Sequence, residues 1–380
     1  MNITGTARKV VILGSAHPLR GGLAAYNERL ARAFTQNGDV VKMINFSLQY
    51  PDFLFPGKTQ FSSEPPPEDL DIETCVNSIN PLSWVRVGWK IKNMKPDLLI
   101  IKFWIPFMGP CLGTISRIVK KNRKTRVISI LDNIVPHEKR PGDRLLASYF
   151  VKPVDGFVAM SRQVLGDLDL FDKKKPRAFC PHPLYDHFGN LTDKNAALKN
   201  LGLDPEFGYL LFFGFIRDYK GLDLLLEAMA NERLQNLKIK LLVAGEFYTD
   251  SKPYFDLVEK LKLQDKVILS NDFIPDSKVA DYFNAADIVV QPYKDATQSG
   301  VTQIAYHFEK PMITTNVGGL AEIVPDGKVG FVVNPDAAEI ADSISRFYSQ
   351  NREAEFINNI QTEKLKYSWE KMIETIDKLT

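Results

Sequence analysis

Residues 209–230 read Tyr-Leu-Leu-Phe-Phe-Gly-Phe-Ile-Arg-Asp-Tyr-Lys-Gly-Leu-Asp-Leu-Leu-Leu-Glu-Ala-Met-Ala. The apolar run Tyr209–Phe213 is typical of a buried strand, and Leu222–Ala230 has the apolar spacing of a helix. Gly214 and Gly221 lie between them, which favours a tight turn from strand to helix. A strand, a short loop and a helix in this order indicate one unit of a parallel sheet covered by helices.

The same alternation of short apolar runs and amphipathic segments extends over the whole chain. It starts twice, and the join falls in the Pro-, His- and Gly-containing stretch Pro181–Asn195. Each half has the size of one doubly wound α/β unit, so we expect two parallel sheets. The expected strands are Lys9–Gly14, Val40–Asn45, Asp97–Lys102, Arg126–Leu131 and Gly156–Met160, then Tyr209–Phe213, Lys238–Ala244, Lys266–Ser270, Ala286–Gln291, Pro311–Thr315 and Gly330–Val333.

The composition of the chain argues against several classes of protein. The chain of 380 residues carries 48 Lys and Arg against 46 Asp and Glu, and this balance gives no reason to expect a nucleic acid partner. No stretch has the roughly 18 apolar residues of a spanning helix, and Val10–Leu13 is too short for a signal peptide. The three cysteines have no paired spacing, which indicates reduced thiols in a cytoplasmic protein. One segment, Ser47–Thr74, holds five prolines and is expected to be an irregular loop.

Three loops follow expected strands and open expected helices. Ser15–Gly22 ends in paired glycines before a helix, which suits an anion, but it lacks the G-x-G-x-x-G spacing of dinucleotide-binding loops. Gly214–Gly221 contains Arg217 and Lys220, so two cations and a helix N-terminus could hold a diphosphate together. Pro292–Gln303 follows a strand with a carboxylate and a glycine turn, which suits sugar hydroxyls. For each loop taken alone, a solvated turn or a helix cap is the alternative.

Taken together, these segments resemble the family-four class of retaining glycosyltransferases, which have the GT-B fold. The resemblance is carried by Gly214-x-x-Arg217-x-x-Lys220-Gly221, by Gln291-Pro292-Tyr293, and by Gly318-Gly319-x-x-Glu322 followed by Asp326-Gly327. Arg20-Gly21-Gly22 and Pro181-His182-Pro183 agree with the same family. The GT-B fold implies two Rossmann-like domains that face a central cleft. We therefore expect an acceptor-binding domain over residues 1–185, joined by a C-terminal helix at 366–380, and a donor-binding domain over residues 186–365.

The resemblance also implies roles for the matching residues. Arg217 and Lys220 would clamp the donor diphosphate and stabilise its charge as the glycosidic bond breaks, and Asp295 would accept hydrogen bonds from sugar hydroxyls. Neither a metal nor a further cofactor is implied, because the cations and helix ends take that place. The other expected donor-binding residues are Gly21, Gly22, Gly214, Phe273, Ile274, Gly300, Val301, Thr302, Gln303 and Glu322, with Phe273 and Ile274 beside the base.

The chain departs from the family pattern at positions expected to bind the donor and at positions expected to face the acceptor. The pattern has two glutamates eight positions apart, where this chain has Asp295 and Gln303; the latter keeps its hydrogen bonding, to the ribose, without the charge. Phe215 stands where the commoner pattern has the arginine, and Arg217 lies three residues before Lys220. On the acceptor side, many relatives carry a histidine just after the strand that ends here at Leu131. Either Asp132 or His137 is expected to face the acceptor, and the competing explanation is that His137 only orders its loop.

From these residues we expect a metal-independent retaining glycosyltransferase that moves a hexose from a nucleoside diphosphate sugar. The acceptor is expected to be a hydroxyl of a glycan, a lipid-linked sugar or a small molecule, in bacterial cell-surface polysaccharide synthesis. A non-catalytic sugar-nucleotide-binding protein and a sugar-nucleotide epimerase of the same fold are the alternatives. A peripheral contact with the inner face of the membrane stays open, because some of the aromatic residues Trp84, Trp89, Phe103, Trp104 and Phe107 could form an apolar surface. Most of them are expected in the core.

Overall fold

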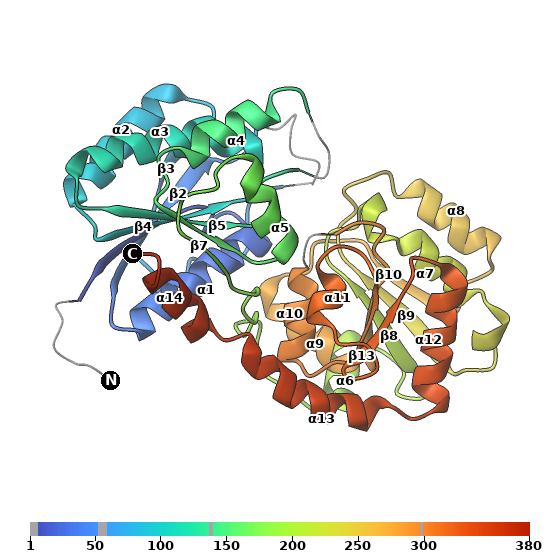
Figure 1. Ribbon diagram of the computed structural model, residues 1–380. Coiled ribbons are helices and arrows are strands. Elements are labelled where there is room, and N and C mark those ends of the chain that lie inside the picture. Colours follow the sequence, from blue (N-terminus) through green and yellow to red (C-terminus); the bar gives the residue numbers. More distant parts are fainter. Residues whose placement is uncertain (1–6, 52–58, 137–139, 297–298) are drawn as a thin grey trace. The chain divides into compact units, whose positions relative to one another are not determined.

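The computed structural model describes residues 7–51, 59–136, 140–296 and 299–380. The chain divides into two compact units, of which unit 1 comprises residues 1–183 with 368–380 and unit 2 comprises residues 184–367. These divisions lie within two residues of the boundaries expected from the sequence. Each unit contains one parallel sheet covered by helices (Figure 1). No helix within the described ranges is long and apolar enough to span a bilayer.

Unit 1 has a seven-stranded parallel sheet in the order β3-β2-β1-β4-β5-β6-β7. The order reverses between β1 and β4, so the loops that follow these two strands meet at a switch point, where ligands bind in such sheets. Helices α2, α3 and α4 lie side by side on one face of the sheet, and α1 with the C-terminal α14 lies on the other (Figure 1). The strands are β1 (Lys9–Leu13), β2 (Val40–Leu48), β3 (Ile72–Asn77), β4 (Leu98–Phe103), β5 (Arg126–Leu131), β6 (Gly156–Ala159) and β7 (Arg177–Phe179). The helices are α1 (Gly22–Gln36), α2 (Pro81–Met94), α3 (Gly109–Val119), α4 (Asp143–Val151), α5 (Arg162–Asp167) and α14 (Trp369–Asp377).

Unit 2 has a six-stranded parallel sheet in the order β10-β9-β8-β11-β12-β13, with its switch point between β8 and β11. The strands are β8 (Gly208–Phe213), β9 (Ile239–Ala244), β10 (Val267–Ser270), β11 (Ile288–Gln291), β12 (Met312–Thr315) and β13 (Gly330–Val333). The helices are α6 (Lys194–Leu201), α7 (Leu222–Met229), α8 (Lys252–Lys260), α9 (Asp276–Ala285), α10 (Gly300–His307), α11 (Leu320–Ile323), α12 (Ala337–Ser349) and α13 (Glu353–Glu363). The expectation of two doubly wound parallel sheets is confirmed.

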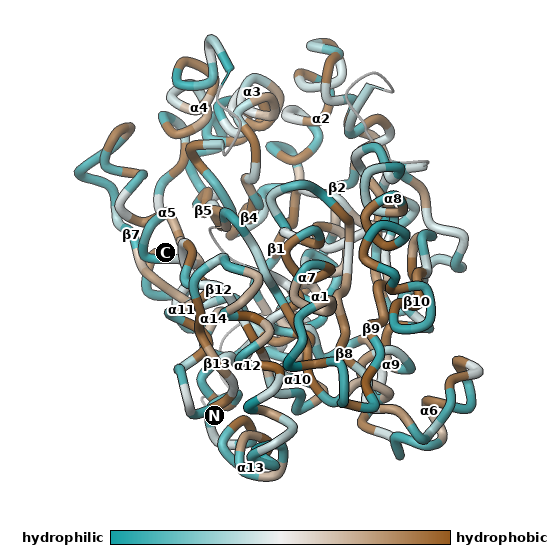
Figure 2. Tube along the Cα trace, turned by 90° about the vertical axis from the view of Figure 1, so that its right-hand side faces the viewer, coloured by the Kyte–Doolittle hydropathy of each residue, from teal (hydrophilic) through white to brown (hydrophobic). Residues whose placement is uncertain are grey.

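The central strands form the core of each unit because helices cover them on both faces. Every residue of β4 is buried, and β8 is buried from Tyr209 to Phe212. Such strands have continuous rather than alternating apolar sequences, which is why the sequence predicts them well. In Figure 2, β8 and β9 are largely hydrophobic, while the surrounding helices are of mixed hydropathy. Lys102 is the exception in β4, a charged residue that is only 3% exposed.

Two edge strands, β3 and β7, are missing from the sequence-based expectation. Both are only partly buried, so neither has the apolar run that marks a central strand. β3 begins at Ile72, inside the segment expected to be irregular. The described residues 59–71 of that segment pack on the first glycine loop: Leu19 and Phe61 form an isolated antiparallel bridge, and the backbone N–H of Arg20 donates to the carbonyl of Gln60 at 3.0 Å.

Candidate functional site

The loops after β8 and β11 meet at the switch point of unit 2. Gly221 has a φ of 68°, and a β-carbon there would lie 2.0 Å from the carbonyl oxygen of Pro292. The backbone N–H of Lys294 donates to the carbonyl of Tyr219 at 2.7 Å. Only glycine permits both this left-handed turn and this close approach, so the two loops that carry the expected donor-binding residues are packed on each other.

Lys220 lies inside the turn that Gly214 and Gly221 allow. Residues Asp218–Lys220 form one turn of 3-10 helix, closed by a bond from the Lys220 N–H to the Arg217 carbonyl at 2.9 Å. A β-carbon on Gly214 would lie 3.2 Å from Nζ of Lys220 and 3.7 Å from Cγ2 of Val301. The glycine therefore makes room for the ammonium group, and the structure brings these three predicted residues together.

The two cations of this loop repel each other. Burial of the Lys220 ammonium, and then the nearby positive charge of Arg217, lower the pKa of Lys220 to about 7. A group that is only partly protonated at neutral pH gains its full charge when an anion binds beside it. An anion placed beside the two side chains would therefore favour the protonated form of Lys220.

Aromatic rings line the neighbouring strand ends. Phe215 stacks on Tyr248 with ring centroids 4.2 Å apart and on Phe273 at 6.0 Å. The guanidinium carbon of Arg217 lies 5.2 Å from the centroid of Tyr248. The loops after β8, β9 and β10 thus form an aromatic shelf, defined by Phe215, Tyr248 and Phe273, next to Arg217. Ile274, the other residue expected beside the base, follows Phe273 and is half-buried.

Helix α10 brings the third loop to the same edge of the sheet. Gly300 opens the helix, and a β-carbon there would lie 2.8 Å from the ring of Tyr185. The first N–H groups of a helix have no partner inside it, which suits the predicted use of backbone amides at Gly300, Val301 and Thr302. Asp295 is exposed in the loop before this helix.

Gln303 occupies the interior of unit 2. Its side chain is fully buried, and among the described residues neither amide atom has a hydrogen-bond partner. Thr302 also points inward, where its hydroxyl donates to Oε1 of Gln291 at 3.0 Å. Nε2 of Gln291 and the hydroxyl of Thr314, on the neighbouring strand, likewise lack partners within the described part of the chain. A buried polar cluster with this much unused hydrogen-bonding capacity is unusual.

Glu322 follows the next strand of the sheet after β11. It is exposed on the four-residue helix α11, after β12, and β11 lies between β12 and β8 in the sheet. The hydroxyl of Thr315 donates to the carbonyl of Tyr293 at 2.5 Å and connects the loops after β11 and β12.

In unit 1, Gly21 and Gly22 lie where the sequence expects them, at the start of α1. Gly21 has a φ of 94° and precedes the first residue of the helix. Asn45, at the position where dinucleotide-binding proteins have an acidic residue, is fully buried and holds the loop. Its Oδ1 accepts from the N–H of Ala16 at 3.0 Å, and its Nδ2 donates to the carbonyls of Ala16 and His17 at 2.8 and 2.9 Å.

Asp132 is paired with a residue that the sequence analysis missed. Nζ of Lys102 lies 2.8 Å from Oδ1 of Asp132, and it also lies 3.4 Å from the ring centroid of Tyr26. Burial lowers the pKa of Lys102, and the carboxylate of Asp132 opposes that shift. The signal in the sequence was a single lysine inside an otherwise apolar strand. His137, the other candidate on this side, lies outside the described residues.

His182 and Trp369 complete the surroundings of Tyr26 in unit 1. The Tyr26 centroid lies 5.0 Å from that of His182 and 5.1 Å from that of Trp369, which is 3% exposed. Burial, and then the charge of Lys102, lower the pKa of His182 to about 3, so this imidazole is neutral at physiological pH. Trp369 is a buried packing residue of α14. In the described part of the chain no three His, Cys, Asp or Glu residues are grouped to hold a metal ion.

Residues 193–363 match the family model described as glycosyl transferases group 1. The matched residues make up most of unit 2.

Curated relatives of this family align with part of the chain. A D-inositol 3-phosphate glycosyltransferase 2 of Catenulispora acidiphila is 30% identical over 187 residues, which cover 47% of this chain and 44% of the relative. A D-inositol 3-phosphate glycosyltransferase of Segniliparus rotundus is 33% identical over 150 residues, which cover 39% and 33%. The chain therefore spans less than half the length of these two relatives.

Solved structures are similar to this chain over nearly its whole length. Sucrose-phosphate synthase from Thermosynechococcus elongatus is similar with a TM-score of 0.72 and 18% identity, covering 98% of both chains. HepE of Anabaena, solved with UDP and glucose, is similar with a TM-score of 0.73 and 15% identity, covering 98% of this chain and 100% of the other. The chain thus has the GT-B fold, as the sequence predicts.

Proposed function

We propose that the chain is a retaining, metal-independent glycosyltransferase that moves a hexose from a nucleoside diphosphate sugar to an acceptor hydroxyl. The observation that carries the proposal is the meeting of Lys220 and Val301 at Gly214, with the positive charge of Arg217 close to Lys220. Two cations beside the first turn of α10 suit a diphosphate, and the group 1 match of residues 193–363 supports the same ligand.

The donor residues have separate roles in this proposal. Arg217 and Lys220 hold the diphosphate and stabilise the negative charge that it gains as the bond between the sugar and its phosphate oxygen breaks. The aromatic shelf faces the base, and Asp295 accepts hydrogen bonds from the sugar. Gln303 hydrogen-bonds the ribose, which would satisfy an amide that has no partner among the described residues.

The acceptor oxygen attacks the anomeric carbon from the side of the leaving phosphate, so the configuration is retained. The new bond joins the acceptor oxygen to that carbon, and the acceptor proton passes to the departing phosphate oxygen. This route is proposed because Arg217 and Lys220 supply positive charge rather than a nucleophile.

Unit 1 is the proposed acceptor-binding unit. Asp132, held by Lys102, would orient the acceptor hydroxyl, and the Gly21-Gly22 turn offers a second anion-binding helix start. The relatives quoted above are named for D-inositol 3-phosphate, a phosphorylated polyol. Because these names give no support for a polysaccharide, the proposed acceptor is a hydroxyl-bearing molecule of glycan, lipid-linked or polyol type. We place the activity in the cytoplasm, with a peripheral membrane contact through unit 1.

A panel of UDP-, GDP- and ADP-sugars tests this function. We expect slow release of nucleoside diphosphate from one donor without an acceptor, and faster release with a suitable one. Lys220→Ala, which keeps the fold but loses the ammonium, should release none above background. Tight donor binding without turnover would instead establish a sugar-nucleotide sensor, and release of an epimerised sugar would establish an epimerase.

A further inference from the structure

Positive charge is concentrated on one helical layer of unit 1. Residues 81–95, 109–124 and 140–153, which contain α2, α3 and α4, include twelve Lys and Arg and one Asp. Their net charge is +11, although the whole chain has a net charge of only +2, so the rest of the chain sums to −9. These three helices cover one face of the sheet (Figure 1). We call this surface the basic face.

Large apolar side chains are exposed on the same helices. On α2, Leu82 is 80% exposed, Val85 43% and Trp89 46%, and their spacing puts them on one side of the helix. On α4, Leu145 is 76% exposed and Tyr149 38%. The core-facing side of α2 is made by other residues, Val87 and Ile91, so the exposed ones are not needed for packing. Single exposed apolar residues are ordinary, but a group beside many cations marks an interaction surface.

Helix α2 also carries Lys and Arg residues beside its exposed apolar side chains. Arg86 and Lys90 are exposed, and Nζ of Lys92 lies 3.8 Å from the ring centroid of Trp89. Lys90 pairs with Glu73, but α2 itself contains no acidic residue. A helix with an apolar outer stripe flanked by Lys and Arg has the composition of helices that lie in the interface of an anionic membrane.

A basic pocket lies where α3 and α4 end. It has a volume of about 480 Å³ and is lined by Arg117, Lys120, Lys152, Pro153, Val154, Asp155 and Lys175. Four cations therefore surround a single carboxylate. That carboxylate, Asp155, is already used, since it accepts from Nζ of Lys120 at 2.6 Å and from the N–H of Val127 at 2.8 Å. The pocket has an excess of positive charge.

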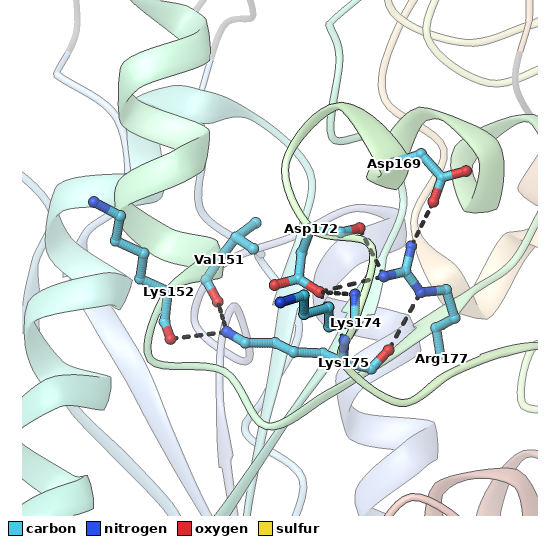
Figure 3. A network of polar contacts seen from close by, with 7 residues as sticks. All are labelled: Val151, Lys152, Asp169, Asp172, Lys174, Lys175 and Arg177. Atoms are coloured by element: carbon cyan, nitrogen blue, oxygen red, sulfur yellow. Dashed lines mark hydrogen bonds and ion pairs between the residues drawn. The ribbon is translucent and has the colours of Figure 1, made fainter.

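Protein contacts hold these cations in place. Nζ of Lys175 donates to the carbonyls of Val151 and Lys152 at 2.6 and 2.8 Å, as Figure 3 shows. The guanidinium of Arg117 donates to the carbonyls of Gly113 and Tyr149 at 2.8 and 2.6 Å. Burial lowers the pKa of Lys175; the carboxylates of Asp172 and Asp155 oppose this shift, and the charges of Lys120 and Arg117 add to it. An anion in the pocket would offset the mutual repulsion of its cations.

We propose that the basic face of unit 1 docks on a bilayer that contains anionic phospholipids, with a lipid phosphate in the basic pocket. The exposed apolar residues enter the interface, and the cations of α2, α3 and α4 lie at the level of the headgroups. A bilayer, rather than free phosphate, fits both the charge and the apolar groups beside it. The inference refines the peripheral contact proposed above but does not depend on transferase activity.

Vesicle sedimentation without donor or acceptor tests this docking. The full chain should bind vesicles with 30% phosphatidylglycerol at least tenfold more tightly than vesicles of phosphatidylcholine alone, and high salt should weaken this binding. Leu82→Ser/Trp89→Ser should lower binding about tenfold, and Lys121→Glu/Lys152→Glu should abolish the preference for the anionic lipid. Equal binding to both vesicle types would overturn the proposal.

Matched variants on unit 2 control for general effects. Leu365 is 74% exposed and Lys238 has a 76% exposed side chain, so Leu365→Ser and Lys238→Glu change comparable groups outside the basic face. Both should bind vesicles like the unmodified chain, and losses equal to those of the basic-face variants would contradict the assignment. A second result would also refute membrane docking: inorganic phosphate raises the thermal stability of the chain, an effect lost in Lys152→Glu, but the chain does not bind anionic vesicles. Because vesicle binding and turnover are measured separately, either can fail alone.

Discussion

Lys220 makes donor binding sensitive to pH. Its pKa of about 7 in the unliganded chain should rise when a diphosphate lies beside it. The proton is then bound more tightly in the complex, so affinity is full below pH 7 and falls as the pH rises through and above 7, by up to tenfold per unit. Calorimetry of nucleoside diphosphate binding between pH 6 and 9 measures this slope. Lys220→Arg, which stays charged, should lose it, and an unchanged slope in that variant would assign the proton to another group.

We expect the buried amide of Gln303 to lower the stability of the free protein and to raise its affinity for the donor. Because both amide atoms are buried without partners among the described residues, Gln303→Leu removes an unsatisfied group worth about 1–3 kcal/mol. We expect an equal or higher midpoint in urea unfolding and a weaker affinity for the nucleoside diphosphate. Loss of stability with donor affinity intact would mean that the amide serves only the protein core.

Lys102 should stabilise unit 1 through Asp132. Lys102→Met leaves the carboxylate of Asp132, 14% exposed, without its ion-pair partner, and should cost about 3 kcal/mol. Lys102→Met/Asp132→Asn should recover most of this loss, because no unpaired charge remains. Urea unfolding measures both, and a double variant as unstable as the single one would contradict the account. If Asp132 orients the acceptor, acceptor KM should rise in both variants while donor affinity is unchanged.

A single sequence predicts residues that local spacing brings together, but not those that tertiary contacts bring together. Arg217, Lys220 and Gly214 could be predicted because local spacing places them in one strand-to-helix turn. Lys102 lies on β4 and Asp132 directly follows β5, and only the pairing of these two strands brings their side chains together. Phe215 looked like a departure from the family pattern, and the structure places it in the aromatic shelf. The burial of Gln303 depends on how α10 packs, which local sequence does not specify.

At the level of elements, the turn at Gly221 is fixed by two constraints at once. Its positive φ alone should make Gly→Ala cost about 1–2 kcal/mol. A β-carbon 2.0 Å from the Pro292 carbonyl must also push the β8 and β11 loops apart, and this overpacking adds about 1–3 kcal/mol.

Gly202 provides the matched comparison for this turn. Its φ is 64°, and a β-carbon there meets nothing within 4 Å. Gly221→Ala should therefore lower the urea midpoint clearly more than Gly202→Ala and should also weaken donor binding. Equal effects of the two substitutions would show that the contact between the loops is not tight.

Central and edge elements differ in how well the sequence predicts them. The central strands are apolar throughout because both faces are covered, so their positions follow directly from composition. β3 and β7 are partly exposed edge strands with mixed sequences, and their existence depends on the neighbour with which each pairs. Sequence order alone could place the carboxyl ends of the central strands, and with them most of the candidate donor residues.

At the level of the whole molecule, two units of similar architecture carry different charge. The chain as a whole has a net charge of only +2, a value that conceals the +11 of the basic face on unit 1. Overall composition therefore gave no sign of an anionic partner, whereas the arrangement of α2, α3 and α4 does. In unit 2 the proposed donor-binding residues gather at one switch point, where Lys220 lies close to Val301 of α10.

The central claim is that Arg217 and Lys220 bind the diphosphate of a nucleotide sugar. Calorimetric affinity for the donor selected by the panel tests it most directly, with Arg217→Ala, Lys220→Ala and the control Arg233→Ala, whose side chain is 57% exposed at another loop of unit 2. We predict that each of the first two loses about 2–4 kcal/mol of binding, at least thirtyfold, while the control is unchanged. Donor affinity that survives both substitutions would contradict the account.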